Sequence, residues 1–189
     1  MMQVLEDIPY GLVITSAMFC AVALYRFFRP RRRWRIGAAD AVLAKINSIE
    51  HAGQRFGYLR KIDPFTFEEM ILTALEREGH KITRNKRYTG DGGLDGRVEI
   101  NGVKFLVQAK RYTSHINPKD VSKFVTLCTR HKRSGLFVHT GKTGPASKVA
   151  IRSSNVQLIS GEKLLLLLDD DRVLFPTIDH HNNRKTVVA

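Results

Sequence analysis

Residues 90–112 read GDGGLDGRVEINGVKFLVQAKRY. Two runs of alternating apolar and polar residues flank Asn101-Gly102, the kind of dipeptide that most favours a two-residue β-hairpin turn. With these two residues in the loop, Ile100 lies opposite Val103 and the two runs pair as antiparallel strands. The stretch therefore predicts a hairpin that follows a glycine-rich turn, and the rest of the domain can be placed around it.

The register of this hairpin brings three polar side chains together. Counting back from the turn, Asp95 lies opposite Gln108, and Lys110 lies one diagonal step away on the same face. A second, apolar set shares the other face and is expected to enter the core: Val98, Ile100, Val103, Phe105, Val107 and Ala109. A slip of one residue would turn this apolar set towards solvent, so the pattern specifies the register.

A carboxylate, an amide and an ammonium group on one sheet face have two interpretations. Carboxylate and amide oxygens suit a hard divalent cation such as Mg²⁺. A neighbouring lysine can orient a water molecule or stabilise the charge that grows on a phosphate. The alternative is an ordinary polar sheet face held by ion pairs, which are common in proteins.

The segments around the hairpin predict an alternation of helices and strands. Asp63-Pro64 is a strong helix start, because Asp caps the helix and Pro suits its first position. The apolar stripe of this helix ends at Gly79. The other expected elements are a strand in 80–88, a helix from Asn117-Pro118, a strand at 135–140, a helix at 146–152, a strand at 156–160 and a helix at 161–168. The order α-β-β-β-α-β-α-β-α predicts an α/β fold.

The charge balance points to a polyanionic partner. The chain has 189 residues and a formal net charge of +13, and residues 61–168 contain 19 Lys and Arg against 10 Asp and Glu. A basic domain suits nucleic acid, because each contact with a phosphate releases a counterion. The alternative is a solvated basic surface. Only Cys20 and Cys128 are present, which excludes a disulfide framework and a cysteine zinc site.

The N-terminal region predicts a membrane anchor. Residues 8–25 are an uncharged run of 18, and residues 26–35 contain six arginines. A run of this length approaches the ~20 residues of a spanning helix, and arginines stay on the cytoplasmic side. We therefore expect one transmembrane helix over 8–28, with the N-terminus outside the cell membrane, lipid contacts through 8–35 and the remaining chain in the cytoplasm. A signal peptide would need basic residues before the run, and a buried helix would not explain the arginines.

The resulting organisation has four parts. The transmembrane helix over 8–28 is followed by a basic juxtamembrane helix and linker over 29–62. The folded domain is expected over 63–168, and a polar tail over 169–189.

Together these segments resemble the Mrr-type restriction endonuclease domain, a branch of the PD-(D/E)xK nuclease superfamily. The matching pieces are Phe67-Glu68 in the first helix, GDGGLDG (90–96), VQAKRY (107–112), GLFVHT (135–140) and VQLISGEKLLLLL (156–168). A glycine-flanked Asp followed by QAK is the most specific part. The resemblance implies a restriction-endonuclease-like mixed sheet flanked by helices, and DNA cleavage that depends on Mg²⁺ or Mn²⁺.

The resemblance also implies roles for individual residues. Asp95 would bind the metal, Lys110 would be the catalytic lysine, and Glu68 would be the helical acid that completes the metal site. Glu69, one position further on, is the alternative for that acid. Gln108 stands where most of the superfamily has Glu or Asp, so it would offer the metal a neutral oxygen and leave the site one charge short.

The expected function is that of a membrane-anchored, Mg²⁺-dependent DNA endonuclease. Candidates for contacts with the DNA backbone are Arg111, Lys104, Lys86, Arg87 and Lys142. The alternative from another class is a catalytically silent DNA-binding or scaffold protein on the same fold, and RNA cleavage would use the same chemistry. Cutting of both DNA strands would favour a homodimer.

Overall fold

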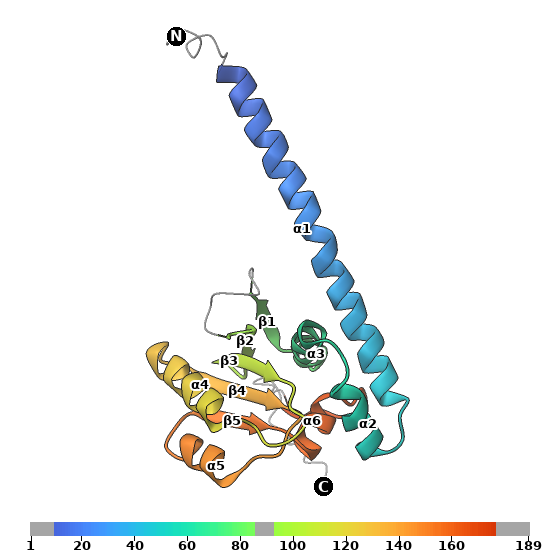
Figure 1. Cartoon of the computed structure of the whole chain (residues 1–189), viewed down its shortest axis with the longest axis vertical. Helices are drawn as coiled ribbons and strands as arrows, with labels where there is room; N and C mark the ends of the chain where they lie inside the picture. The colour runs from blue at the N-terminus through green and yellow to red at the C-terminus, as the bar shows by residue number, and fades with distance from the viewer. Residues whose placement is uncertain (1–9, 86–92, 177–189) are drawn as a thin grey trace, which may run out of the picture.

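The computed structural model describes residues 10–85 and 93–176, with the side chains of 10–13 and 23–35 left out (Figure 1). Its elements are α1 (Tyr10–Asn47), α2 (Ala52–Leu59), α3 (Pro64–Arg77), β1 (Lys81–Arg84), β2 (Gly96–Ile100), β3 (Val103–Lys110), α4 (Pro118–Arg130), β4 (Ser134–His139), α5 (Pro145–Ile151), β5 (Val156–Ile159) and α6 (Glu162–Leu167). From α3 onwards this is the predicted order of helices and strands.

The strands form one mixed sheet of five in the order β1-β2-β3-β4-β5. The first three strands pair antiparallel, and β3, β4 and β5 run parallel. The mixed α/β sheet with flanking helices confirms the coarse fold prediction.

The predicted hairpin is confirmed in turn and register. Asn101 and Gly102 have φ angles of 49° and 78°, the two positive values that a type I′ turn requires. Ile100 pairs with Val103, and the ladder continues to Gly96 opposite Val107. The predicted core placement of Val103 is wrong, since its side chain is 50% exposed beside the turn.

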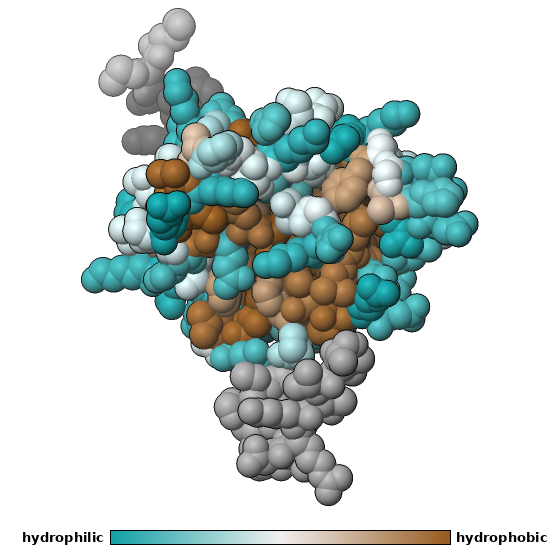
Figure 2. All heavy atoms as spheres, turned by 90° about the horizontal axis from the view of Figure 1, so that it is seen from below, coloured by the Kyte–Doolittle hydropathy of each residue, from teal (hydrophilic) through white to brown (hydrophobic). Residues whose placement is uncertain are grey.

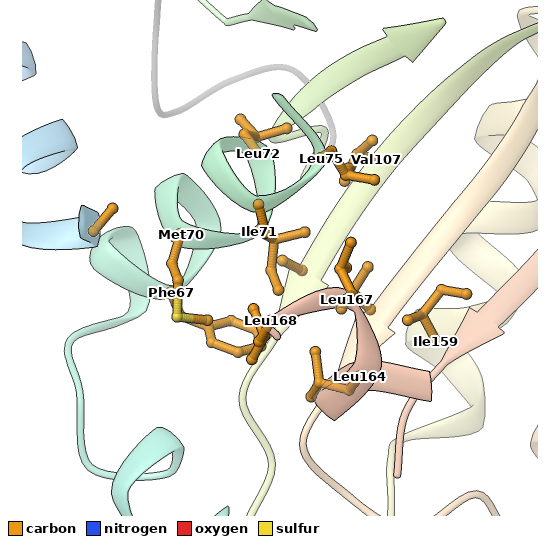
Figure 3. Close-up of a cluster of buried hydrophobic side chains, with 14 of the residues drawn as sticks. Phe67, Met70, Ile71, Leu72, Leu75, Val107, Ile159, Leu164, Leu167 and Leu168 are labelled. Atoms are coloured by element: carbon orange, nitrogen blue, oxygen red, sulfur yellow. The ribbon is translucent and has the colours of Figure 1, made fainter. Parts of the chain in front are cut away.

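Helices cover both faces of the sheet. On one face, α1, α3 and α6 enclose a core that includes Val98, Val107 and Leu136. Figure 3 shows how Phe67 and Ile71 of α3 approach Leu164 and Leu167 of α6 in this core. On the other face, α4 packs on Leu106 and Phe137. Along β3, the face that carries Gln108 and Lys110 also carries Lys104 and Leu106, and of these four residues only Leu106 belongs to the core beneath α4.

The C-terminal part of α1 belongs to the domain. Ala39, Leu43 and Ile46 are at most 1% exposed and lie in the same core as α3. The predicted linker over 29–62 is thus a packed part of the fold from Ala39 onwards, because its apolar stripe meets the outer surface of α3. Figure 1 shows the rest of α1 extending away from the sheet.

Among the described residues, no helix combines the length and apolar character that a membrane span requires. The predicted transmembrane helix over 8–28 begins outside those residues.

The start of the predicted polar tail packs back on the domain. Glu78 accepts hydrogen bonds from the backbone N–H groups of Leu174, at 2.7 Å, and Phe175, at 3.3 Å. Residues 177–189 lie outside the described part of the chain. Figure 2 shows the face at the end of the molecule away from the N-terminus, where polar residues surround an apolar area. The half-buried Leu165 and Leu166 of α6 line a hollow between α2 and α6.

Candidate active site

A cleft opens at the carboxyl end of β3, between the beginning of α3 and the beginning of α4. Its volume is about 320 Å³, and it is lined by Pro64, Glu68, Ala109, Lys110, Arg111, Tyr112 and Asp120. Both helices begin at a capped proline there: Asp63 accepts from the backbone N–H groups of α3, and Asn117 accepts from the N–H of Lys119 in α4. Two predicted site residues, Glu68 and Lys110, therefore share one cleft although they are distant in sequence.

Asp95 lies against the wall of this cleft. Its backbone N–H donates to the carbonyl oxygen of Val107 at 3.0 Å, although the ladder pairs Val107 with Gly96, so the regular register ends at Gly96. Its carboxylate accepts a hydrogen bond of 2.6 Å from the N–H of Ala109, a residue that lines the cleft. Asp95 is thus held beside the QAK segment through Ala109, whereas the predicted pairing directly opposite Gln108 is not part of the ladder.

Gln108 is held by the glycine-rich turn. Its side chain is almost fully buried, and its Nε2 donates to the carbonyl oxygen of Gly93 at 2.6 Å. Gly93 has φ +85°, and a Cβ at this position would lie 2.4 Å from Gln108 Nε2. Only glycine allows this close approach without a shift. Within the described residues no group donates to Gln108 Oε1, so the amide is anchored through its nitrogen.

Lys110 is paired with an acid that sequence reasoning missed. Lys110 Nζ lies 3.3 Å from Asp120 Oδ2, and the Tyr112 hydroxyl donates to the same oxygen at 2.6 Å. Burial opposes the ionisation of Asp120, but the hydrogen bond from Tyr112 and the charge of Lys110 outweigh it and lower the pKa of the carboxyl group. Burial and the neighbouring Asp120 raise the pKa of Tyr112, which therefore stays a neutral donor.

A sequence signal existed for Tyr112 but not for Asp120. Tyr112 stands two positions after Lys110, and an extension of the strand period places both on one face. Asp120 stands in the first turn of a helix, where acids are common for electrostatic reasons alone. Its pairing with Lys110 depends on how α4 packs beside β3.

The structure separates the two candidate helical acids. Glu68 is half-buried and lines the cleft. Glu69 is 3% exposed and accepts a hydrogen bond from Arg84 Nε, and the same guanidinium donates to Glu76 at 2.6 Å. Glu69 is therefore engaged in an ion-pair network between α3 and β1, which leaves Glu68 as the helical acid of the cleft.

Backbone contacts hold one wall of the cleft. Arg111 Nη1 donates to the carbonyl oxygen of Arg60 at 2.8 Å, and Arg60 Nη2 donates to the carbonyl oxygen of Thr140 at 3.0 Å. The hydroxyl of Thr140 bonds both the N–H and the carbonyl oxygen of Tyr112 at 2.9 Å. Arg111 is a candidate DNA contact, and its guanidinium also links the end of α2 to the end of β3.

The other candidate DNA contacts lie in different places. Lys142 is exposed, and its backbone pairs with the loop after β3 through the N–H of Ile116 at 3.0 Å. Lys104 is exposed near the hairpin turn, at the opposite end of β3 from Lys110. Lys86 and Arg87 lie outside the described residues.

The oxygen groups of this site fit a hard divalent cation with few protein ligands. In the described part of the chain, no three His, Cys, Asp or Glu side chains come together as a metal cluster. What the cleft and its wall offer instead is the carboxylates of Glu68 and Asp95, to which the predicted site would add the neutral oxygen of Gln108. A set of two carboxylates and one neutral oxygen suits Mg²⁺, which keeps several water ligands and binds substrate phosphates.

Comparison with known proteins gives a family match. The model of the Mrr catalytic domain family, described as a restriction endonuclease, matches residues 59–168, which is more than half of the chain. A solved structure of a DNA modification-dependent restriction endonuclease, AspBHI, is similar with 24% sequence identity and a TM-score of 0.44. That similarity covers 74% of this chain and 37% of the other, so the chain spans little more than a third of AspBHI. A comparison with curated proteins finds no match.

Proposed function

The chain belongs to the restriction endonuclease family of nucleases, and we propose that it hydrolyses DNA phosphodiester bonds in the cleft at the end of β3. The observation that carries this proposal is the convergence of Glu68 and Lys110 in one cleft whose wall binds Asp95. Helix α3 and the β2–β3 hairpin, which are separate in sequence, supply these groups.

Each residue of the cleft has a separate proposed role. Lys110 steadies the negative charge that grows on the scissile phosphate, or orients the attacking water. Asp120 holds Lys110 through the ion pair at 3.3 Å, and Tyr112 fixes Asp120 through its hydrogen bond. Gln108 is anchored to Gly93, so its oxygen is presented in one orientation. The groups are thus positioned before substrate binds, which lowers the cost of organising them in the transition state.

Glu68, Asp95 and Gln108 are the residues that would hold Mg²⁺ or Mn²⁺. When bound, such a cation supplies Lewis-acid stabilisation of the phosphate charge. Because Gln108 carries no charge, the binding energy depends on the two carboxylates. We therefore expect loss of either Glu68 or Asp95 to weaken cation binding more than a Gln108→Ala change does, as isothermal titration calorimetry with Mn²⁺ would measure.

We further propose that the N-terminal segment anchors the chain in the cell membrane, with the N-terminus outside and the nuclease domain in the cytoplasm. The uncharged run over 8–25 precedes the arginines of 26–35. On α1, the side chains of Ile14, Met18 and Phe19 are 65%, 66% and 75% exposed, and a lipid environment would bury them. A phosphatase fused before residue 8 should be active outside the cell. Activity only of a fusion at the C-terminus would refute this topology.

Plasmid nicking by the full chain tests the proposed activity. The wild type should nick supercoiled plasmid with Mg²⁺ and not with EDTA, whereas Asp95→Asn and Lys110→Met should lose at least about a hundredfold in rate. A Lys163→Gln variant, which changes an exposed lysine of α6, is the matched control and should keep its rate. Equal nicking by all four proteins would refute the assignment of the site. DNA binding without nicking by the folded wild type would instead support a silent binding protein.

A further inference from the structure

A second hollow lies on the sheet, away from the cleft. It has a volume of about 470 Å³ between strands β1–β3 and the turn after α4. Four bases, Lys81, Arg97, Lys104 and Arg133, line it together with His131, and Glu99 is its single acid. We refer to it as the basic groove. None of its lining residues lines the cleft.

The strand register explains why these charges gather. Lys81 pairs with Glu99, and Glu99 pairs with Lys104, so these three side chains form one row on the same sheet face. Arg97 pairs with Leu106, which belongs to the core beneath α4. The basic groove is therefore on the α4 side of the sheet, where the side chains of β1 and β2 are exposed.

Three bases of the basic groove are available to a ligand, and the fourth, Arg97, donates to Asn85 Oδ1 at 3.3 Å. In the described ranges, no acidic side chain comes within ion-pair distance of Lys81, Lys104 or Arg133. Arg130, His131 and Lys132 are exposed beside Arg133 and extend the positive surface. Glu99 offsets only part of this positive charge, and like charges held close together destabilise a fold unless a counter-charge binds.

The groove and the cleft lie at the two ends of α4. Asp120 in its first turn contacts Lys110 in the cleft, and His131 just after its last turn lines the groove. Along β3, Lys104 and Lys110 share a face and are six residues apart, which corresponds to about 20 Å. That distance equals about six base pairs of B-form DNA.

We propose that the basic groove binds the phosphate backbone of DNA about six base pairs from the scissile bond. This inference rests on the proposed nuclease function and adds a contact surface that is separate from the cleft. The charge of the groove matches a phosphate chain, and its concave shape admits a narrow ridge of phosphates more readily than a flat anionic membrane. A second copy of this chain bound by two-fold symmetry would place its own basic groove against the same positive charges.

The test compares two variants with the same net charge. The groove variant is Lys81→Gln, Lys104→Gln and Arg133→Gln. The control variant is Lys45→Gln, Lys163→Gln and Arg172→Gln, which removes three exposed bases of α1, α6 and the segment after it. Binding of the full chain to a labelled 30-base-pair duplex is measured by fluorescence anisotropy in EDTA, from 50 to 300 mM KCl, so that no cleavage occurs.

The groove variant should lower the slope of log affinity against log salt by about 2.7, since each lost phosphate contact contributes about 0.9. Its affinity near 0.1 M salt should fall by roughly a hundredfold or more. The control variant should change the slope by less than about 0.9, the contribution of one phosphate contact. A Glu99→Gln variant, which removes the acid from the row, should bind DNA more tightly than the wild type.

Equal slopes for the groove and control variants would overturn the proposal. The same applies if the groove variant loses binding only to vesicles that contain phosphatidylserine, because the surface would then be a lipid contact. Nicking is measured separately. The expected slopes without any nicking would support DNA binding by the basic groove and refute the proposed catalysis. Unchanged slopes with Mg²⁺-dependent nicking would refute DNA binding by the groove and support the catalysis.

Discussion

Replacement of Gly93 by Ala should disturb the site through Gln108. Two costs can be worked out from the structure. The φ of +85° is a left-handed conformation, which costs a residue with a Cβ about 1–2 kcal/mol. The new Cβ would also lie 2.4 Å from Gln108 Nε2, so the buried amide must move and lose its hydrogen bond to Gly93. An unsatisfied buried amide costs about 1–3 kcal/mol.

The chain offers a matched control for the first of these costs. Gly102 has φ +78°, and a Cβ there would meet no atom within 4 Å. Gly102→Ala should therefore lower the free energy of unfolding by about 1–2 kcal/mol, and Gly93→Ala by about 2–5 kcal/mol. Urea denaturation with an unchanged m-value measures both. Gly93→Ala should also slow plasmid nicking by about tenfold or more, because a misplaced Gln108 no longer presents its oxygen correctly. Gly102→Ala should nick normally.

A double-mutant cycle isolates the contact. In a Gln108→Ala background, Gly93→Ala should cost no more than Gly102→Ala, because the clashing amide is absent. If Gly93→Ala and Gly102→Ala lower the free energy of unfolding equally in the wild-type background, the contact between Gly93 and Gln108 does not organise the site.

Two further predictions concern the charges near the cleft. Glu68→Gln should abolish nicking and leave the free energy of unfolding unchanged. Glu69→Gln should lower the free energy of unfolding by about 3 kcal/mol, because it leaves the nearly buried Arg84 without one of its acids. If urea denaturation shows the larger loss of stability for Glu68→Gln, the two acids have the opposite roles. His139 is fully buried, which lowers its pKa to about 4 from 6.5, so the unfolded chain takes up a proton first as the pH falls. The free energy of unfolding should then decrease by up to about 3 kcal/mol between pH 6.5 and pH 4, and a His139→Gln variant that showed the same decrease would contradict this.

Much of the domain could be predicted from short stretches of sequence. The hairpin register follows from Asn101-Gly102, whose positive φ angles and two-residue loop leave one pairing for the apolar face. The starts of α3 and α4 follow from Asp63-Pro64 and Asn117-Pro118, because capping satisfies the free N–H groups within a single turn. These features depend on residues that are neighbours in sequence, so their physics is local.

The residues that line the cleft could be predicted only in part from the sequence. Glu68 and Glu69 are adjacent in α3, and the helix turns by about 100° between them. One therefore points into the cleft and the other towards Arg84, but only the packing of α3 against β1 and β3 determines which. Asp120 meets Lys110 for a similar reason, since α4 returns along β3 and brings its first turn beside the end of the strand.

The extent of the domain was likewise decided by tertiary structure. The spacing of apolar residues from Ala39 to Ile46 predicts an amphipathic helix. It does not predict which surface of the domain covers the apolar stripe of that helix. The sequence by itself determined the hairpin, the helix caps and the order of elements, because local hydrogen bonds and side-chain periodicity specify them. The tertiary structure alone decided which helical acid reaches the cleft, which acid holds Lys110 and where the domain begins, because these depend on long-range packing between separate elements.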